Sequence, residues 1–179
     1  MLNSLEVNKE KIKYFFTDVD GTLTNAFCSY SAQGELLKNF NLRDGTGFYM
    51  LKKLGIKVGI ITGEDSLIVQ QRANKLKLEY CFLGVKDKYS LICKFLKENN
   101  SKFEEFAYIG DDFNDLKLLK ASGISFCPSD AHILVQNSVN YVCSNKGGEG
   151  AFREASEILL ACNENKVIEQ IVSDLFLKD

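Results

Sequence analysis

The sequence lacks several features that mark particular classes of protein. It has no tryptophan, a single histidine and a single proline. It also has no uninterrupted stretch of about 18 apolar residues of the kind that spans a membrane. Its first thirteen residues are interrupted by glutamate and lysine, which excludes the apolar core of a signal peptide. These absences predict a cytoplasmic protein with no membrane partner and no proline-rich linker.

Cysteine is present, but its spacing does not suggest a disulfide framework or a zinc site. The six cysteines include no C-x-x-C pair, and most lie inside apolar segments. We therefore expect buried, reduced thiols. The positions are Cys28, Cys81, Cys93, Cys127, Cys143 and Cys162.

Charge and length limit the class of protein further. The 22 lysines and arginines nearly balance the 24 aspartates and glutamates, giving a formal net charge of −2. Bulk charge therefore predicts no nucleic-acid partner. With 45% hydrophobic residues, a chain of 179 residues can bury one core, so we expect a single domain over residues 1–179.

Short apolar segments alternate with segments of helical periodicity along the chain. We expect core strands at residues 14–17, 56–61, 80–83, 106–109, 124–127 and 141–143. We expect helices at residues 43–54, 65–77, 89–98, 115–121, 152–162 and 167–177. The alternation predicts an α/β fold, a Rossmann-like three-layer sandwich whose sheet is mainly parallel.

A hairpin is expected at about residues 24–42, between the first core strand and the first helix. Residues 27–30 and 36–41 are strand-like and flank a turn that contains Gly34. Leu36, Leu37 and Phe40 are apolar residues that a protruding ribbon cannot easily bury by itself, which favours a partner surface. The alternative, a hairpin folded onto its own sheet, stays open.

Polar residues directly follow several of the expected strands. In parallel α/β sheets the carboxyl ends of the strands meet at one edge, where functional sites collect. If the first strand stays extended, its two aspartates leave the same side of the backbone. The residues in question are Asp18, Asp20, Thr62, Gly63, Lys88, Asp111, Asp112 and Asp115.

Four or more carboxylates at two strand ends would repel one another unless a cation neutralised them. The set contains no histidine or cysteine, and an all-oxygen set favours Mg²⁺. An isolated D-x-D is more often a solvated turn, but placement of acidic residues at two strand ends favours a metal site. Carboxylate, hydroxyl, lysine and metal together make a phosphoryl-transfer site.

The order of these residues resembles a known family. Asp18-Val19-Asp20-Gly21-Thr22, then Thr62-Gly63, then Lys88, and finally Gly110-Asp111-Asp112-Phe113-Asn114-Asp115, is similar to the four motifs of haloacid dehalogenase-type phosphatases. The resemblance covers about residues 12–160.

The resemblance implies a role for each matching position. It implies that Asp18 is the nucleophile that forms an aspartyl-phosphate, and that Asp20 is the general acid and base. It implies that Thr62 and the Gly63 amide bind phosphate oxygens and that Lys88 orients nucleophile and phosphate. The metal would be held by Asp18, Asp111 and the carbonyl group of Asp20, with Asp112 and Asp115 behind them, Asp115 steadying Lys88.

Members of this family usually carry a cap domain after the first or second motif, and neither interval here is long enough for one. Finer patterns resemble the capless 3-deoxy-octulosonate 8-phosphate phosphatase group, whose members are tetramers that complete one another's sites. The resemblance therefore implies a homotetramer assembled through the hairpin. The patterns are Lys38-x-Phe40-x-x-Arg43-Asp44-Gly45-x-Gly47, Arg72-Ala73-x-Lys75-Leu76 and Gly147-Gly148-Glu149-Gly150-Ala151-Phe152-Arg153-Glu154.

One position bears on the substrate, which the resemblance implies is a phosphorylated 2-keto-3-deoxy sugar acid. Octulosonate 8-phosphate enzymes typically have arginine after Thr-Gly, whereas this chain has Glu64, as do relatives that act on nonulosonate 9-phosphates. Glu64 can accept hydrogen bonds from sugar hydroxyls, while Arg72 and Lys75 of a neighbour could bind the substrate carboxylate. This favours the nine-carbon substrate. The alternatives are the eight-carbon substrate and a solvated Glu64 at a helix start.

Two other classes of protein are less consistent with the motifs. A signalling receiver domain also places acidic residues, a threonine and a lysine around Mg²⁺. Its phosphorylated aspartate follows a strand in the middle of its sequence, whereas here the D-x-D-G-T motif follows the first strand along the chain. A catalytically idle, phosphatase-like oligomerisation module loses motif residues, whereas this chain retains Asp18, Asp20, Thr62, Lys88 and Asp111.

Overall fold

A computed structural model of the protein describes residues 11–178. Six parallel strands form one sheet, in the order β5-β4-β1-β6-β7-β8. This order confirms the expected α/β fold with a parallel sheet. The strands are β1 (Tyr14–Thr17), β4 (Lys57–Ile61), β5 (Tyr80–Phe82), β6 (Phe106–Ile109), β7 (Ile124–Cys127) and β8 (Tyr141–Val142).

β1 lies in the middle of the sheet because all four of its residues are apolar or small enough to be buried on both faces. It pairs with β4 on one side and β6 on the other, so that Thr17 is level with Ile60 and Ile109. The segments that follow these three strands therefore begin side by side, at the edge of the sheet formed by the carboxyl ends of the strands.

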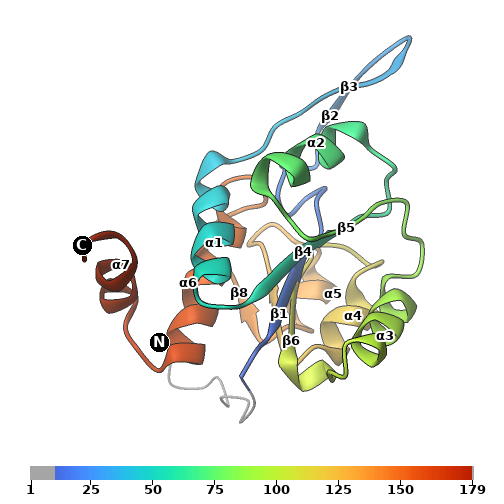
Figure 1. Cartoon of the computed structure of the whole chain (residues 1–179). Helices are drawn as coiled ribbons and strands as arrows, with labels where there is room; N and C mark the ends of the chain where they lie inside the picture. Colours follow the sequence, from blue (N-terminus) through green and yellow to red (C-terminus); the bar gives the residue numbers. More distant parts are fainter. Residues whose placement is uncertain (1–10, 179) are drawn as a thin grey trace.

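Helices cover both faces of the sheet, as Figure 1 shows. On one face, Phe15 of β1 stacks on Phe152 of α6, and Phe152 stacks on Phe48 of α1 with 4.1 Å between ring centroids. On the other face, Phe16 packs against Phe95 of α3. The helices are α1 (Leu42–Lys53), α2 (Leu67–Leu76), α3 (Lys88–Glu98), α4 (Leu116–Ala121), α5 (Ile133–Gln136), α6 (Ala151–Glu164) and α7 (Ile168–Phe176).

The expected hairpin is present and projects from the body of the protein (Figure 1). Its strands, β2 (Cys28–Ser31) and β3 (Gly34–Lys38), form a separate two-stranded antiparallel sheet. The apolar side chains along it are exposed, Leu36 to 65% and Leu37 to 50%. The second strand is shorter than predicted, so Phe40 lies beyond it and packs partly buried against the core.

The sequence patterns did not predict the short helix α5 or the 3₁₀ turn Phe103–Glu105, because three or four residues carry no usable periodicity. All six cysteines are free, as expected, but only Cys127 and Cys143 are fully buried and the other four are half-buried. Within residues 11–178, no helix has the length and hydropathy needed to cross a bilayer.

Candidate active site

The predicted site residues lie in the loops that follow the central strands. The backbone amide of Asp18 donates to the carbonyl of Ile109, and that of Thr62 donates to the carbonyl of Phe82, so each loop leaves the sheet in register with its neighbour. Lys88 is the first residue of α3 and directly follows the loop that leaves β5. Because the strands are parallel, these loops converge at one edge of the sheet.

A buried lysine joins two aspartates at the centre of this edge. The Nζ atom of Lys88 lies 2.8 Å from Oδ1 of Asp18 and 2.7 Å from Oδ1 of Asp115, and all three side chains are nearly inaccessible to solvent. The hydroxyl group of Tyr108, in β6, also donates to Oδ1 of Asp115 at 2.7 Å. Tyr108 belongs to an otherwise apolar strand, so no sequence pattern marked it.

Asp115 is fully committed to hydrogen bonds within the protein. Its Oδ2 atom accepts from the backbone amides of Asp111 and Asp112, at 3.2 and 3.4 Å. Its Oδ1 atom is already shared by Lys88 and Tyr108. Asp115 is therefore placed to hold the loop after β6 and the ammonium group of Lys88, with no oxygen left over.

Asp111 lies against the loop that follows Asp18. Its Oδ1 atom accepts from the hydroxyl of Thr22 at 3.2 Å. Gly21, at φ +88°, permits this approach, since a Cβ atom there would lie 2.0 Å from Oδ2 of Asp111. The backbone carbonyl of Gly21 is covered in turn by Gly147, whose own Cβ would lie 1.9 Å from that oxygen. Glycine is required at both positions because backbone or a carboxylate occupies the space of a side chain.

Burial raises the pKa of both acidic groups that face this space. The pKa of Asp18 rises to about 7 because the carboxyl is desolvated and lies near the charge of Asp115, although Lys88 opposes the rise. The pKa of Asp111 rises to about 8 through desolvation and the charges of Asp18 and Asp115. Crowded carboxylates of this kind need a further positive charge to stay ionised.

The donor set fits a hard divalent cation. Asp18, Asp111 and Asp115 each offer an oxygen atom, and these oxygens lie within 4.8 Å of one another. Since the oxygens of Asp115 already accept hydrogen bonds, Asp18 and Asp111 are the two side chains available to a metal. An all-oxygen set suits Mg²⁺ or a similar ion and is unsuited to soft metals.

Asp20 does not share the environment of Asp18. An extended chain would place both carboxylates on the same side of the backbone, but the strand ends at Thr17 and the chain turns at Asp20, whose side chain is directed to the hairpin. There, Oδ1 of Asp20 forms an ion pair with Lys38, the last residue of β3. Its Oδ2 atom is buried and has no hydrogen-bond partner among residues 11–178.

Lys38 begins the pattern Lys38-x-Phe40-x-x-Arg43-Asp44-Gly45-x-Gly47, but the sequence did not predict it to be a site residue. Its side chain is 2% exposed and also lies 3.2 Å from Oε1 of Glu35. Burial lowers the pKa of Lys38, but the hydrogen bonds and charges of Asp20 and Glu35 outweigh burial and raise it above its usual value. A lone lysine in a hairpin gives no sequence signal of such a position.

The loop after β4 is held close to the site by its own hydrogen bonds. The hydroxyl oxygen of buried Thr62 accepts from the amide of Glu64 at 3.2 Å, which leaves the hydroxyl proton free to donate. Lys86 donates to the carbonyl of Gly63 at 3.2 Å. The side chain of Glu64 is exposed.

Three other predicted residues have side chains that lie outside this cluster of hydrogen bonds. Asp112 is exposed and accepts from the amide of its neighbour Phe113. Arg72 and Lys75 are on α2, where the guanidinium of Arg72 donates to the carbonyl of Asn41. They line a groove between α1 and α2 together with Leu42, Gly45, Thr46, Tyr49, Leu76 and Phe176.

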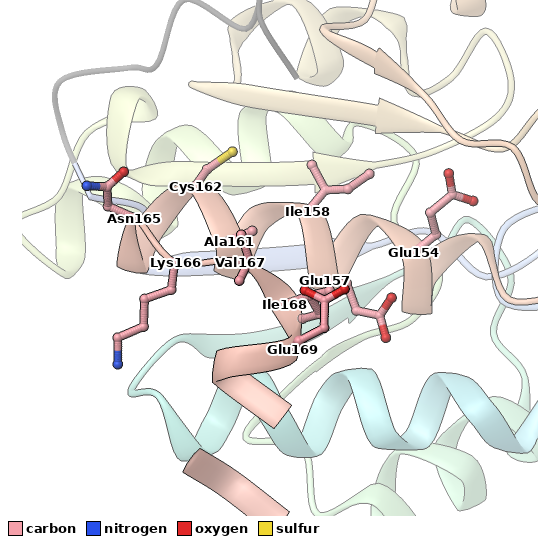
Figure 2. Close-up of a pocket in the computed structure, with 10 residues that line it drawn as sticks. All are labelled: Glu154, Glu157, Ile158, Ala161, Cys162, Asn165, Lys166, Val167, Ile168 and Glu169. Carbon is pink, nitrogen blue, oxygen red and sulfur yellow. The ribbon is translucent and has the colours of Figure 1, made fainter. Parts of the chain in front are cut away.

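A second groove of about 700 Å³ runs along α6 and α7 and is shown in Figure 2. Ile158 and Ile168 are among its apolar lining residues, and Figure 2 shows Ile168 beside Glu157 and Glu169, where the start of α7 meets α6. None of the described residues that line it belongs to the predicted site. The remaining lining residues are Glu154, Ala161, Cys162, Asn165, Lys166 and Val167.

Comparison with known proteins agrees with the geometry. A family model of haloacid dehalogenase-like hydrolases matches residues 84–153. The 3-deoxy-D-manno-octulosonate 8-phosphate phosphatase of Haemophilus influenzae is 43% identical over 151 residues, which is 84% of each chain. That of Escherichia coli K12 is 34% identical over 151 residues, 84% of this chain and 80% of its own.

Solved structures extend the similarity to three dimensions. The cobalt-bound Haemophilus influenzae phosphatase superimposes with a TM-score of 0.83 at 41% identity, covering 88% of this chain and 92% of its own. The Moraxella catarrhalis phosphatase in complex with magnesium, phosphate and KDO gives a TM-score of 0.85 at 32% identity, covering 91% and 92%. This chain is therefore a phosphatase of the haloacid dehalogenase superfamily and belongs to the 3-deoxy-D-manno-octulosonate 8-phosphate phosphatase group.

Proposed function

We propose that this phosphatase hydrolyses the phosphomonoester of a 2-keto-3-deoxy sugar acid, with Mg²⁺ as its cofactor and Asp18 as its nucleophile. The observation that carries the proposal is the buried cluster in which Lys88 bridges Asp18 and Asp115, with Asp111 beside it. A nucleophilic carboxylate, a fixed cation and a metal-binding carboxylate are the parts that phosphoryl transfer needs.

In the first step, a carboxylate oxygen of Asp18 attacks phosphorus and the bond from phosphorus to the sugar oxygen breaks. Lys88 orients the attacking carboxylate through its 2.8 Å contact and neutralises charge on the phosphoryl oxygens. Asp20 donates its proton to the departing sugar oxygen, so that the sugar leaves as an alcohol. The hydroxyl of Thr62 and the amide of Gly63 donate to the phosphoryl oxygens.

In the second step, the carboxylate of Asp20 accepts a proton from a water molecule. The oxygen of that water attacks the phosphorus of the aspartyl-phosphate, and the bond between phosphorus and Asp18 breaks. Inorganic phosphate leaves, and both aspartates return to their starting forms. One carboxylate thus splits a difficult hydrolysis into two easier displacements.

Mg²⁺ would be held by Asp18, Asp111 and the carbonyl group of Asp20. When bound, it would supply positive charge that stabilises the ionised carboxylates and the charge of the phosphoryl group. The raised pKa values of Asp18 and Asp111 support this placement because a cation there favours the ionised form of both carboxyls.

The relatives favour octulosonate 8-phosphate as the substrate, since similar enzymes carry that name and one was solved with KDO. Glu64 favours a nonulosonate 9-phosphate, because its exposed carboxylate can accept hydrogen bonds from additional sugar hydroxyls. We propose Arg72 and Lys75, presented by a neighbouring subunit, as the groups that bind the substrate carboxylate.

The first experiment measures phosphate release, with Mg²⁺, from matched octulosonate 8-phosphate and nonulosonate 9-phosphate. A tenfold or greater preference for either substrate decides between them, and no release from either would contradict the proposed substrate class. Asp18→Asn should abolish turnover, while the variant retains the fold and the oligomeric state of the parent protein. Asp174→Asn, a change at an exposed carboxylate on α7 that belongs to no proposed site, serves as the matched control and should retain turnover.

We also propose that the hairpin assembles the protein into a homotetramer. Four large apolar side chains on the hairpin segment are half or more exposed, which is costly for a ribbon in water. Replacing Tyr30 by serine should dissociate the assembly, as measured by light scattering after size exclusion, and an unchanged mass would contradict the assignment. The four side chains are Phe27, Tyr30, Leu36 and Leu37.

A further inference from the structure

The base of the hairpin contains a buried ion pair that ends at Asp20. Lys38 contacts Oδ1 of Asp20 and lies 3.2 Å from Oε1 of Glu35. The side chain of Lys38 is 2% exposed, whereas the tip of the hairpin is open to solvent. A lysine buried to this extent is stable only when its charge is balanced. The carboxylate of Glu35 supplies one negative charge, and it does so also when Asp20 carries the proton of the proposed mechanism.

A β-bulge brings Glu35 and Lys38 together. Cys28 to Ser31 pair with Lys38, Leu37, Glu35 and Gly34 in turn, so Leu36 has no partner on β2. Side chains three residues apart on a regular strand face opposite sides, and one extra residue re-aims them. The bulge thus places the side chains of Glu35 and Lys38 on the same side of the hairpin, where they form an ion pair.

Glu35 is held from a second direction. Its Oε2 atom accepts a hydrogen bond from the hydroxyl of Ser66. Ser66 is buried and also caps the N-terminus of α2, where its oxygen accepts from the amide of Val69 at 3.3 Å. The loop that contains Thr62 and Gly63 ends at this cap, so Glu35 connects the predicted phosphate-binding loop to the side chain of Asp20.

We infer that Lys38 is the positioning residue for Asp20, and that Glu35, anchored by Ser66, holds Lys38 in place. The hairpin thereby sets the direction of the carboxyl group that exchanges protons with the leaving group. One oxygen of Asp20 is tied to Lys38, and the other is buried without a hydrogen-bond partner among residues 11–178. Oδ2 is therefore the oxygen of Asp20 that no described residue of the protein holds. This inference rests on the proposed function, in which Asp20 is the general acid and base.

The inference predicts that replacing Lys38 lowers turnover by an amount that depends on the leaving group of the substrate. An alkyl alcohol needs a proton to leave, whereas 4-nitrophenolate leaves without one. Lys38→Met keeps the length of the side chain and removes its charge, so Asp20 loses its anchor. We expect turnover of the sugar phosphate to fall by about 100-fold, the scale of general acid catalysis. We expect turnover of 4-nitrophenyl phosphate to fall less than tenfold, and Lys38→Arg to recover part of the loss.

Three further variants make the test decisive. Glu35→Gln should show a weaker form of the same leaving-group dependence, and the double variant with Lys38→Met should be no worse than Lys38→Met alone, since both act through one contact. Lys94→Met, on the exposed face of α3, is the matched control for loss of a lysine. It should leave the turnover of both substrates unchanged.

The outcomes separate this inference from the proposed function. If Asp20→Asn itself shows no leaving-group dependence, the general acid assignment fails. A second outcome concerns Lys38. If Asp20→Asn shows the leaving-group dependence, but Lys38→Met lowers the turnover of both substrates equally or lowers the turnover of neither, the positioning role of Lys38 is wrong. Circular dichroism and light scattering check that each variant folds and assembles. If Lys38→Met does not fold, the same comparison is made with Glu35→Gln, where equal effects on both substrates would overturn the inference.

Discussion

Asp44 offers a quantitative test of the electrostatics away from the site. It lies in the first turn of α1 and is 1% exposed. One of its carboxyl oxygens accepts from the backbone amide of Arg153, while Oδ2 is buried without a hydrogen-bond partner among residues 11–178. Desolvation raises the pKa of Asp44 from 3.8 to about 6, although Arg72 and Arg153 partly oppose the rise.

The sign of the effect on stability follows from the raised pKa. The folded protein holds this proton more tightly than the unfolded chain, so Asp44 costs no stability below about pH 4. The cost grows as the pH rises from 3.8 towards 6 and is constant above that range. The separation between the two pKa values corresponds to about 3 kcal/mol.

Asp44→Asn removes this charge and retains the oxygen that accepts from Arg153. We expect urea unfolding to give nearly equal free energies for the variant and the parent at pH 4. At pH 7.5 the variant should be more stable by about 3 kcal/mol. Asp65→Asn, at an exposed carboxylate, is the control and should change little at either pH. A variant less stable than the parent at pH 7.5 would refute the reasoning, because it would mean that the charge of Asp44 is favourably paired.

Three more predictions concern steric and buried groups. Gly21→Ala should reduce Mg²⁺ affinity at least tenfold in calorimetry, because the new Cβ takes the space of the Asp111 carboxylate, and unchanged affinity would show that the loop adjusts freely. Tyr108→Phe leaves Asp115 with one donor fewer and should cost about 1–3 kcal/mol in urea unfolding, so an unchanged midpoint would argue against this bond. Burial raises the pKa of Cys127 to about 12, so alkylation at pH 8 followed by peptide mapping should find this thiol unlabelled in the native protein. Rapid labelling would indicate that the core opens.

Much of the fold was predictable because the core strands are short, apolar and end in polar residues. The strands at 14–17, 106–109 and 124–127 have the bounds that were expected. The hairpin was found in the expected region, but its second strand begins and ends earlier. A bulge at Leu36 changes which residues face inwards, and no hydrophobic pattern reveals a bulge in an exposed ribbon.

The site residues at the strand ends could be predicted because parallel topology brings those ends together. Asp18, Lys88 and Asp115 come into contact for this reason. Lys38 and Tyr108 could not be predicted in the same way, since their roles depend on where a hairpin folds back and on what a buried hydroxyl meets. Arg72 and Lys75 lie in a separate groove, because α2 directs them away from the strand ends and towards α1.

The contact between Gly147 and Gly21 has a consequence for biosynthesis. The amide of Gly148 donates to the carbonyl of Thr22 at 3.0 Å, so a segment near the end of the chain closes over a loop near its start. A ribosome that has released only the first strands and helices has not yet released the segment that covers this loop. We therefore expect this edge of the sheet to reach its final form only after residues 147 and 148 have left the exit tunnel.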